Sequence, residues 1–266
     1  MNNILLLLTI LFANNFTSDT YMSPNDFKQS LVTAHRGSSY TAPENTLSAL
    51  KKAIEDGAGF AELDVQETKD GVIVVMHDNN AFRTTGINKA MWEIQSSELF
   101  RANAGAWFSH NFEDEKVPTL EQAIQTAKGK IKLNIELKNN GHSKHLAEGT
   151  VKIIEKNQFV NQCVISSFDP VLLKKVKKLN PNIKTALIVG REKDLDEELY
   201  KSRDYEAISI SYLLIDQNVM RAAAAGNKEV YAWTVNDKDA MVKMIELGVN
   251  SILTNHPDRL LQLLLA

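Results

Sequence analysis

The sequence GFAELDVQETKDGVIVVMHD at residues 59–78 contains a signal for a tight turn, which would bring two acidic residues and a histidine together. An Asp-Gly dipeptide at positions 70–71 favours a two-residue type I′ turn, and β-branched residues flank it, so the stretch predicts an antiparallel hairpin. A turn centred there would place Asp64 opposite His77, with Cβ atoms about 4.5–5.5 Å apart. Because strand side chains alternate, Glu62 would share a face with both of them.

The same turn sets the register of the whole predicted hairpin. It would pair Lys69 with Val72 and Gln66 with Val75. An exposed hairpin with one polar face is the alternative to a functional site. The two acids stand in the otherwise apolar run FAELDV, which keeps both interpretations open.

The composition is that of an ordinary globular protein. The 266 residues are 44% hydrophobic and 24% charged, with a formal net charge of −3, which allows one large domain or two small ones. Scattered Lys and Arg residues and an isoelectric point near 6.1 argue against nucleic acid as a partner, although local positive charge could bind one phosphate. The single cysteine, Cys163, excludes an intrachain disulfide and a cysteine-based zinc cluster, and its apolar neighbours predict a buried core residue.

The N-terminus departs from this composition. Residues 4–13 form an almost unbroken apolar run, which is shorter than the ~20 residues that a membrane-spanning helix needs. We expect residues 1–28 to be a targeting or membrane-anchor segment with a linker, either a signal peptide or the remnant of a membrane segment. The expected location is extracytoplasmic, secreted or anchored to a membrane through residues 4–13, with a cytoplasmic location left open. Residues 29–266 are expected to form one folded domain.

Short β-branched runs alternate with helical patterns along that domain. Nine such runs are residues 31–35, 60–66, 72–77, 131–137, 163–168, 184–189, 207–211, 229–235 and 251–254. If the run at 72–77 is the return arm of the hairpin, eight parallel strands remain. Eight strand-helix units predict a (β/α)8 TIM barrel, an α/β fold with a hairpin after the second strand. A doubly wound open sheet is the structural alternative.

Helix start and stop signals lie between these runs. Thr119, with Gln122 three residues later, fits a capping box. Asp169 precedes a proline, which is favoured in the first turn of a helix. Residues 43–46 should open a further helix that ends at Gly57. Two more helices are expected to begin at Asp216 and Asp237 and to run towards Gly226 and Gly248.

Residues 79–118 interrupt the alternation and predict an insertion before the third barrel strand. The insertion leaves from the end of the hairpin, so we expect it to cover the same end of the barrel, where loops shape specificity. It contains the aromatic residues Trp92, Trp107 and Phe108. We favour the interpretation that these aromatic residues form the small packing core of the insertion over a role in substrate binding.

Active sites of TIM barrels lie at the carboxyl ends of the strands. Three predicted strands carry polar side chains there: His35 and Arg36, Glu62 and Asp64, Glu136 and Lys138. The run 131–138 alternates apolar and polar residues, and its apolar side should meet the surrounding helices. The barrel therefore sends Glu136 and Lys138 inwards, whereas an isolated strand would expose them.

Three of these residues are carboxylates that would repel one another unless a cation or protons neutralise them. Glu62, Asp64 and Glu136 offer only oxygen ligands, which favours Ca2+ or Mg2+ over zinc. A divalent cation is therefore the expected cofactor.

The remaining polar residues suit reaction with a phosphate. His35 and His77 fit an acid and a base, because imidazole titrates nearest neutral pH. Arg36 and Lys138 supply positive charge for phosphate oxygens. Together with the metal site they predict metal-assisted phosphoryl transfer on a small-molecule substrate.

Nine short motifs follow one another between about residues 32 and 257. They are His35-Arg36-Gly37, Pro43-Glu44-Asn45-Thr46, Glu62-Leu63-Asp64, His77-Asp78, Arg83-Thr84-Thr85-Gly86, Pro118-Thr119-Leu120-Glu121, Glu136-Leu137-Lys138, Ser166-Ser167-Phe168 and Trp233-Thr234-Val235-Asn236. In order and spacing this set resembles the motifs of the glycerophosphodiester phosphodiesterase family.

The resemblance implies a (β/α)8 barrel with a small insertion, and hydrolysis of glycerophosphodiesters to sn-glycerol 3-phosphate and an alcohol. By position, the family's catalytic histidines fall on His35 and His77, and its metal ligands on Glu62, Asp64 and Glu136. The positions at which members of the family contact the phosphate, the surroundings of the metal ion or the glycerol correspond to Arg36, Glu44, Lys138 and Trp233. Residues 102–105 read Ala-Asn-Ala-Gly where the family usually has Leu-Asp-Ala-Gly, which leaves the headgroup preference open.

The route that the family implies runs through a cyclic phosphate. One histidine deprotonates the glycerol 2-hydroxyl and the other protonates the leaving alcohol, after which the cyclic phosphate is hydrolysed. Two other functions fit the same residues: a non-catalytic module that binds glycerophosphate or a headgroup, and a phospholipase D-like lyase that stops at the cyclic phosphate. The presence of both His35 and His77 argues against the binding module.

Overall fold

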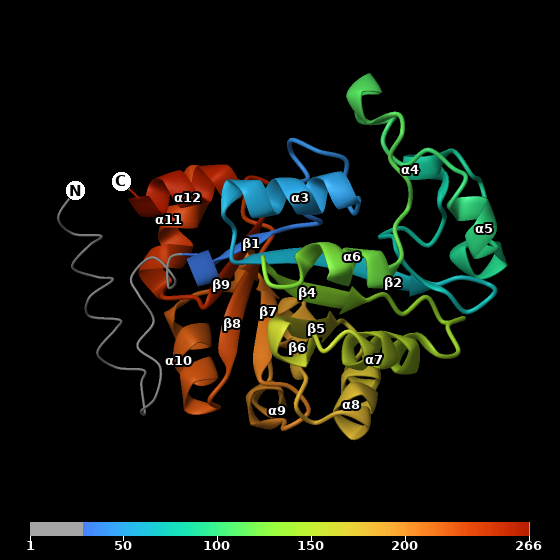
Figure 1. The fold of residues 1–266 in the computed structure, drawn as a ribbon. Helices are drawn as coiled ribbons and strands as arrows, with labels where there is room; N and C mark the ends of the chain where they lie inside the picture. The colour runs from blue at the N-terminus through green and yellow to red at the C-terminus, as the bar shows by residue number, and fades with distance from the viewer. Residues whose placement is uncertain (1–28, 266) are drawn as a thin grey trace.

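The computed structural model describes residues 29–265 as a barrel surrounded by helices (Figure 1). The predicted targeting or anchor segment, residues 1–28, lies outside the described residues. Within residues 29–265, no helix has both the length and the apolar character that crossing a membrane requires.

Eight parallel strands form the barrel, as predicted from the sequence. They are β1 (Val32–Ala34), β2 (Phe60–Glu67), β4 (Lys132–Leu137), β5 (Cys163–Ser167), β6 (Lys184–Val189), β7 (Ala207–Ser211), β8 (Glu229–Trp233) and β9 (Ser251–Thr254). Neighbours pair in the order β1-β9-β8-β7-β6-β5-β4-β2, and β2 pairs in turn with β1. This closure excludes the doubly wound open sheet.

The ninth strand, β3 (Ile73–Val75), pairs with β2 as the return arm of the predicted hairpin. The predicted register was wrong by one residue, because Gln66 lies opposite Val74 and not Val75. Instead of a two-residue turn, residues 68–72 connect the strands, and the Thr68 amide donates to the Val72 carbonyl at 3.0 Å, which encloses a three-residue loop. Gly71 provides the positive φ of 79° that this longer loop needs.

An interaction outside the hairpin explains the longer loop. The Asp70 carboxylate accepts hydrogen bonds from the Thr68 hydroxyl at 2.7 Å and from the amide and hydroxyl of Ser96 at 2.9 and 2.7 Å. Asp70 is thereby bound to the insertion. The shifted register places Met76 opposite Asp64, so that His77 follows the paired residues directly and is not itself paired.

In the part of the chain that the structure describes, eight helices surround the barrel. They are α3 (Leu47–Asp56), α6 (Leu120–Ala127), α7 (Leu146–Lys156), α8 (Pro170–Leu179), α9 (Glu197–Lys201), α10 (Gln217–Ala225), α11 (Lys238–Leu247) and α12 (Pro257–Leu265). Thr119 and Gln122 form the predicted capping box at α6, while Asp169, Asp216 and Asp237 cap their helices through side-chain oxygens. The local helix signals are therefore confirmed.

The main core fills the space between the strands and these helices. On β4, the side chains of Leu133, Ile135 and Leu137 are buried in this core. Side chains alternate along a strand, so Glu136 points into the barrel, as predicted. A smaller cluster, which includes Val164 and Tyr231, forms a second apolar core.

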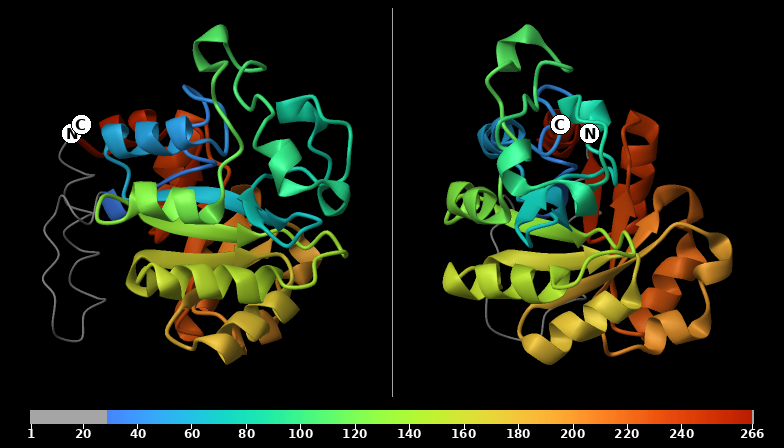
Figure 2. Two further views of the ribbon diagram at one scale, coloured as in Figure 1. Left: turned by 45° about the vertical axis from the view of Figure 1, so that its right-hand side comes forward. Right: turned by 90° about the vertical axis from the view of Figure 1, so that its right-hand side faces the viewer.

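The predicted insertion contains two short α-helices, α4 (Phe82–Thr85) and α5 (Ser96–Leu99), and two 3-10 turns, η1 (Met91–Glu93) and η2 (His110–Phe112). In the ribbon views, α4 and α5 lie near the carboxyl end of β2, and the segment that carries η2 rises above them (Figures 1 and 2).

The expected aromatic core of the insertion is not what the structure shows. Aliphatic residues fill that core instead: Val74, Met76, Ala81, Met91, Ile94, Leu99, Ala104 and Val117. Trp107 is 43% exposed, and Trp92 stacks on His142 of the loop after β4, with ring centroids 4.0 Å apart. Val74 of β3 and Met76 directly after it supply two of the aliphatic side chains, whereas the rings of Trp107, Phe108 and Phe112 pack edge to face on one another outside this core.

Candidate active site

A left-handed turn directly after β1 begins the site. Arg36 and Gly37 adopt positive φ angles of 57° and 76°. A Cβ on Gly37 would lie 2.6 Å from the backbone of Ala49, so this position requires glycine. The turn directs the Arg36 amide to Glu62, and the amide donates to Glu62 Oε2 at 2.8 Å.

Three carboxylates converge inside the barrel at this end. Glu62 and Asp64 come from β2, and Glu136 lies opposite Asp64 on the neighbouring β4. One oxygen from each of the three lies within 4.8 Å of the others. Glu62 and Asp64 are only 3% and 1% exposed, so their mutual repulsion is weakly screened.

Burial and mutual repulsion shift the pKa values of these carboxyl groups. Burial, followed by the charges of Asp64 and Glu136, raises the pKa of Glu62 well above its usual value. Burial and then Asp64 raise the pKa of Glu136 to about 7. Burial alone would also raise the pKa of Asp64, but the nearby charges of Lys138, His77 and Arg36 hold it below its usual value.

Two cations lie against this cluster. Lys138 Nζ is 2.8 Å from Glu136 and 3.6 Å from Asp64. Arg36 Nη1 is 2.8 Å from Glu44, and its Nε is 3.7 Å from Asp64. Both cations have raised pKa values, because the carboxylates outweigh the effect of burial.

The donor set fits a divalent cation. Glu62 Oε1 is buried and has no hydrogen-bond partner among the residues that the structure describes, which is costly for a carboxylate oxygen unless a cation or proton binds it. Oxygen ligands from three carboxylates are those that hard cations prefer. Among the described residues, these three form the group that is arranged to hold a metal ion.

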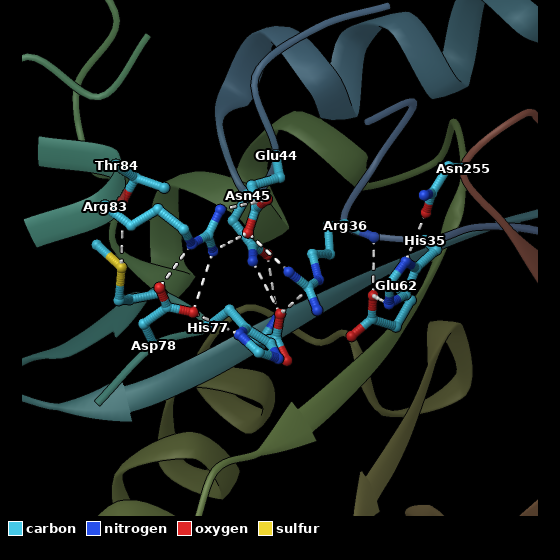
Figure 3. A network of polar contacts seen from close by, with 12 residues as sticks. His35, Arg36, Glu44, Asn45, Glu62, His77, Asp78, Arg83, Thr84 and Asn255 are labelled. Carbon is cyan, nitrogen blue, oxygen red and sulfur yellow. Dashed lines mark hydrogen bonds and ion pairs between the residues drawn. The ribbon is translucent and has the colours of Figure 1, made fainter. Parts of the chain in front are cut away.

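The two predicted catalytic histidines are held by different partners. His35 Nδ1 lies 2.7 Å from Asn255 Oδ1, and His35 Nε2 lies 3.9 Å from Glu62 Oε2. Burial and then the charge of Arg36 lower the pKa of His35 to about 4. His77 Nδ1 lies 2.7 Å from Asp78 Oδ1, so in both histidines Nδ1 makes the close hydrogen-bond contact, and His35 turns its Nε2 towards Glu62 (Figure 3).

Trp233 ends β8, away from the carboxylates. Its Nε1 donates to the Ser209 carbonyl at 2.9 Å, and its ring meets Phe168 edge to face with centroids 5.8 Å apart. Lys138 Nζ lies 6.0 Å from the centre of the Phe168 ring. This aromatic pair thus extends from the charged cluster across the barrel mouth.

Two residues of the site had no predicted role. Asn45 donates from its amide to Asp64 Oδ2 at 2.8 Å and accepts from the Asp64 backbone amide at 3.2 Å. Its positive φ of 59° is typical of asparagine, and the Pro-Glu-Asn-Thr motif contains it. Asn255 had no such signal, because 220 residues separate it from His35.

Comparison with known proteins identifies relatives along most of the chain. Residues 35–259 match the glycerophosphoryl diester phosphodiesterase family. A glycerophosphodiester phosphodiesterase of Caldanaerobacter subterraneus is 35% identical over 239 residues, which cover 88% of this chain and 98% of that protein. A glycerophosphodiester phosphodiesterase of Bacillus altitudinis is 33% identical over 238 residues, which cover 86% of this chain and 95% of that protein.

A solved structure extends the similarity to three dimensions. It is a phosphodiesterase of Oleispira antarctica in complex with the product sn-glycerol 3-phosphate. Its chain is 29% identical to this one and superposes with a TM-score of 0.83 over 88% of this chain and 96% of its own.

Proposed function

This chain belongs to the glycerophosphoryl diester phosphodiesterase family, and from that premise we propose a metal-dependent hydrolysis with two histidines as proton carriers. The substrates are glycerophosphodiesters, and the products are sn-glycerol 3-phosphate and an alcohol. The observation that carries the proposal is the cluster of Glu62, Asp64 and Glu136, which has a histidine near it on either side.

Glu62, Asp64 and Glu136 would hold the cation, either Ca2+ or Mg2+. Bound there, the ion would withdraw negative charge from a phosphate oxygen. Asn45 supports this role because it hydrogen-bonds both the side chain and the backbone of Asp64, in the manner of residues that orient metal ligands.

Arg36 and Lys138 would bind the phosphodiester. Arg36 Nε is buried and has no hydrogen-bond partner within residues 29–265, while Arg36 Nη1 donates to Glu44 Oε1. A guanidinium held in this way suits a phosphate oxygen. Trp233 would offer an apolar wall to the glycerol carbons, since its ring stands across the same mouth with Phe168.

His35 would act as the base and His77 as the acid. The lowered pKa of His35 keeps its ring neutral at neutral pH, so Nε2 can accept the proton of the glycerol 2-hydroxyl. The hydroxyl oxygen attacks phosphorus, the bond from phosphorus to the leaving alcohol breaks, and His77 gives that alcohol its proton. Asp78 beside Nδ1 of His77 is the arrangement that lets an imidazole carry a proton for donation from Nε2. Water then opens the cyclic phosphate.

Two single variants test these roles through the leaving group. On glycerophosphocholine, whose alcohol needs a proton, His35→Ala and His77→Ala should each lower kcat by about 10²–10⁴-fold. On a glycerophosphate p-nitrophenyl ester, whose phenolate leaves without a proton, His77→Ala should recover most of its activity and His35→Ala should not. Calorimetric titration with Ca2+ and Mg2+ checks that both variants keep the wild-type metal affinity.

Near-normal turnover of glycerophosphocholine by either variant would remove that histidine from the mechanism. The opposite leaving-group pattern, with recovery in His35→Ala alone, would exchange the two roles.

A further inference from the structure

Arg83, in α4 of the insertion, binds two carboxylates at the mouth of the barrel. Its Nη1 and Nη2 donate to the two oxygens of Glu44 at 2.9 and 2.7 Å. Its Nε and Nη2 donate to the two oxygens of Asp78 at 2.6 and 3.0 Å. The Trp107 ring covers the guanidinium, with the Arg83 Cζ 5.8 Å from its centroid. Four hydrogen bonds thus hold one planar group between two acids (Figure 3).

Each of these acids also holds a residue of the proposed mechanism. Asp78 Oδ1 lies 2.7 Å from His77 Nδ1, and Glu44 Oε1 lies 2.8 Å from Arg36 Nη1. We propose that Arg83 is a positioning residue that orients His77 through Asp78 and Arg36 through Glu44. The inference rests on the proposed function for the roles of His77 and Arg36.

The branch through Asp78 sets the tautomer and direction of the histidine. With Asp78 as its acceptor, His77 keeps one proton on Nδ1, so the acid form presents its second proton from Nε2 to the reacting groups and the neutral form is the Nδ1–H tautomer. Asp78 is partly exposed, and among the described residues its carboxylate bonds only the side chains of His77 and Arg83, so the orientation of the carboxylate depends on the fork of Arg83. Without that fork, the carboxylate could rotate and His77 would sample other orientations.

The branch through Glu44 shares one carboxylate between two arginines. Glu44 Oε1 accepts from both Arg36 and Arg83, so Arg83 competes with Arg36 for it. Without Arg83, both oxygens of Glu44 would be free to bind Arg36 and would draw its guanidinium away from Asp64. Weaker phosphate binding, and therefore a higher KM, should accompany the loss of proton transfer.

A purely mechanical role is the competing explanation. Arg83 joins the insertion to the barrel, so its removal could simply loosen the fold. Loosening would lower turnover of every substrate to a similar degree. Loss of orientation at His77 instead depends on whether the leaving alcohol needs a proton.

Arg83→Lys is the informative variant, because it keeps the positive charge but lacks the planar fork that bonds two carboxylates at once. Arg101→Lys is its matched control, since Arg101 is an exposed arginine of the same insertion. On glycerophosphocholine, Arg83→Lys should lower kcat about 10- to 100-fold and raise KM. On the p-nitrophenyl ester its kcat should stay within about threefold of wild type. Arg101→Lys should match wild type on both substrates.

Histidine NMR provides a readout that does not require turnover. The chain has six histidines, and His77→Gln identifies the ring signals of His77 in protein labelled with 15N-histidine. Asp78→Asn should shift the His77 Nδ1 and Nε2 signals towards a mixture of tautomers, Arg83→Lys should shift them part of the way, and Arg101→Lys should leave them in place.

Two results would overturn the positioning role. One is an Arg83→Lys variant with wild-type His77 signals and wild-type kinetics. The other is an equal loss of kcat on both substrates, again with unchanged His77 signals. A wild-type enzyme that turns over neither substrate would contradict the proposed function, whereas the NMR comparison would still decide whether Arg83 orients His77.

Discussion

Glu62 and Glu136 lie close enough to Asp64 that the three side chains cannot all be ionised cheaply without a cation. Burial and Asp64 together raise the pKa of Glu136 to about 7, and burial, followed by the charges of Asp64 and Glu136, raises the pKa of Glu62 well above its usual value. A carboxylate must lose its proton to ligate a metal ion. Protons and the cation therefore compete for the same oxygens.

Metal affinity should consequently fall as the pH decreases through 7. Below that pH, Glu136 is protonated in the metal-free protein, and each proton displaced costs about tenfold in apparent affinity per pH unit. Calorimetric titrations with Mg2+ or Ca2+ between pH 5.5 and 8.5 should show weaker binding and greater proton release at the acid end.

Glu121→Gln serves as a control, because Glu121 is a surface carboxylate paired with Lys156; this variant should follow the wild-type curve. Glu136→Gln should bind the ion weakly at every pH. Wild-type affinity that stays constant from pH 5.5 to 8.5 would contradict competition at this cluster.

Among the secondary-structure elements, the hairpin of β2 and β3 was predicted from the sequence in its position but not in its register. Strand positions and helix caps follow from local patterns, and the structure has them where they were predicted. The register was not predictable in this way, because Asp70 bonds Ser96, 26 residues further along the chain. Asn255 was missed for the same reason, since its contact with His35 depends on the closed barrel.

Asp70→Ala should destabilise the junction of the hairpin and the insertion. The substitution removes three hydrogen bonds, of which one satisfies an amide at the start of α5, so the free energy of unfolding should fall by about 1–2 kcal/mol. In thermal unfolding the midpoint should drop by about 2–8 °C.

Lys69→Ala, at the exposed neighbouring position, should change the free energy of unfolding by less than about 0.5 kcal/mol. Equal stability of Asp70→Ala and Lys69→Ala would mean that the contact with Ser96 does not support the hairpin.

At the scale of the whole molecule, the closed barrel buries the single cysteine. Burial raises the pKa of Cys163 to about 12, and the side chain lies in the core between strands and helices. The thiolate is the reactive form. Native protein at pH 8 should therefore react with a thiol reagent far more slowly than a free cysteine, and denaturant should expose one thiol per chain.

The rate of labelling should follow unfolding of the barrel, with Cys163→Ser as the unlabelled control. Rapid native labelling, at the rate of a free thiol, would show that the barrel opens at β5 without global unfolding.

Hydrolysis of glycerophosphodiesters by this protein should require a metal ion, and phosphorus NMR tests both the reaction and this requirement. Wild-type protein is incubated with glycerophosphocholine and Mg2+ or Ca2+, with and without a chelator. We expect the phosphodiester signal to be replaced by that of glycerol 3-phosphate, and the chelator to stop the conversion. Conversion that is unchanged by the chelator would contradict metal dependence. A cyclic phosphate that persists would identify a lyase, and an unchanged substrate signal across a panel of headgroups would identify a binding module.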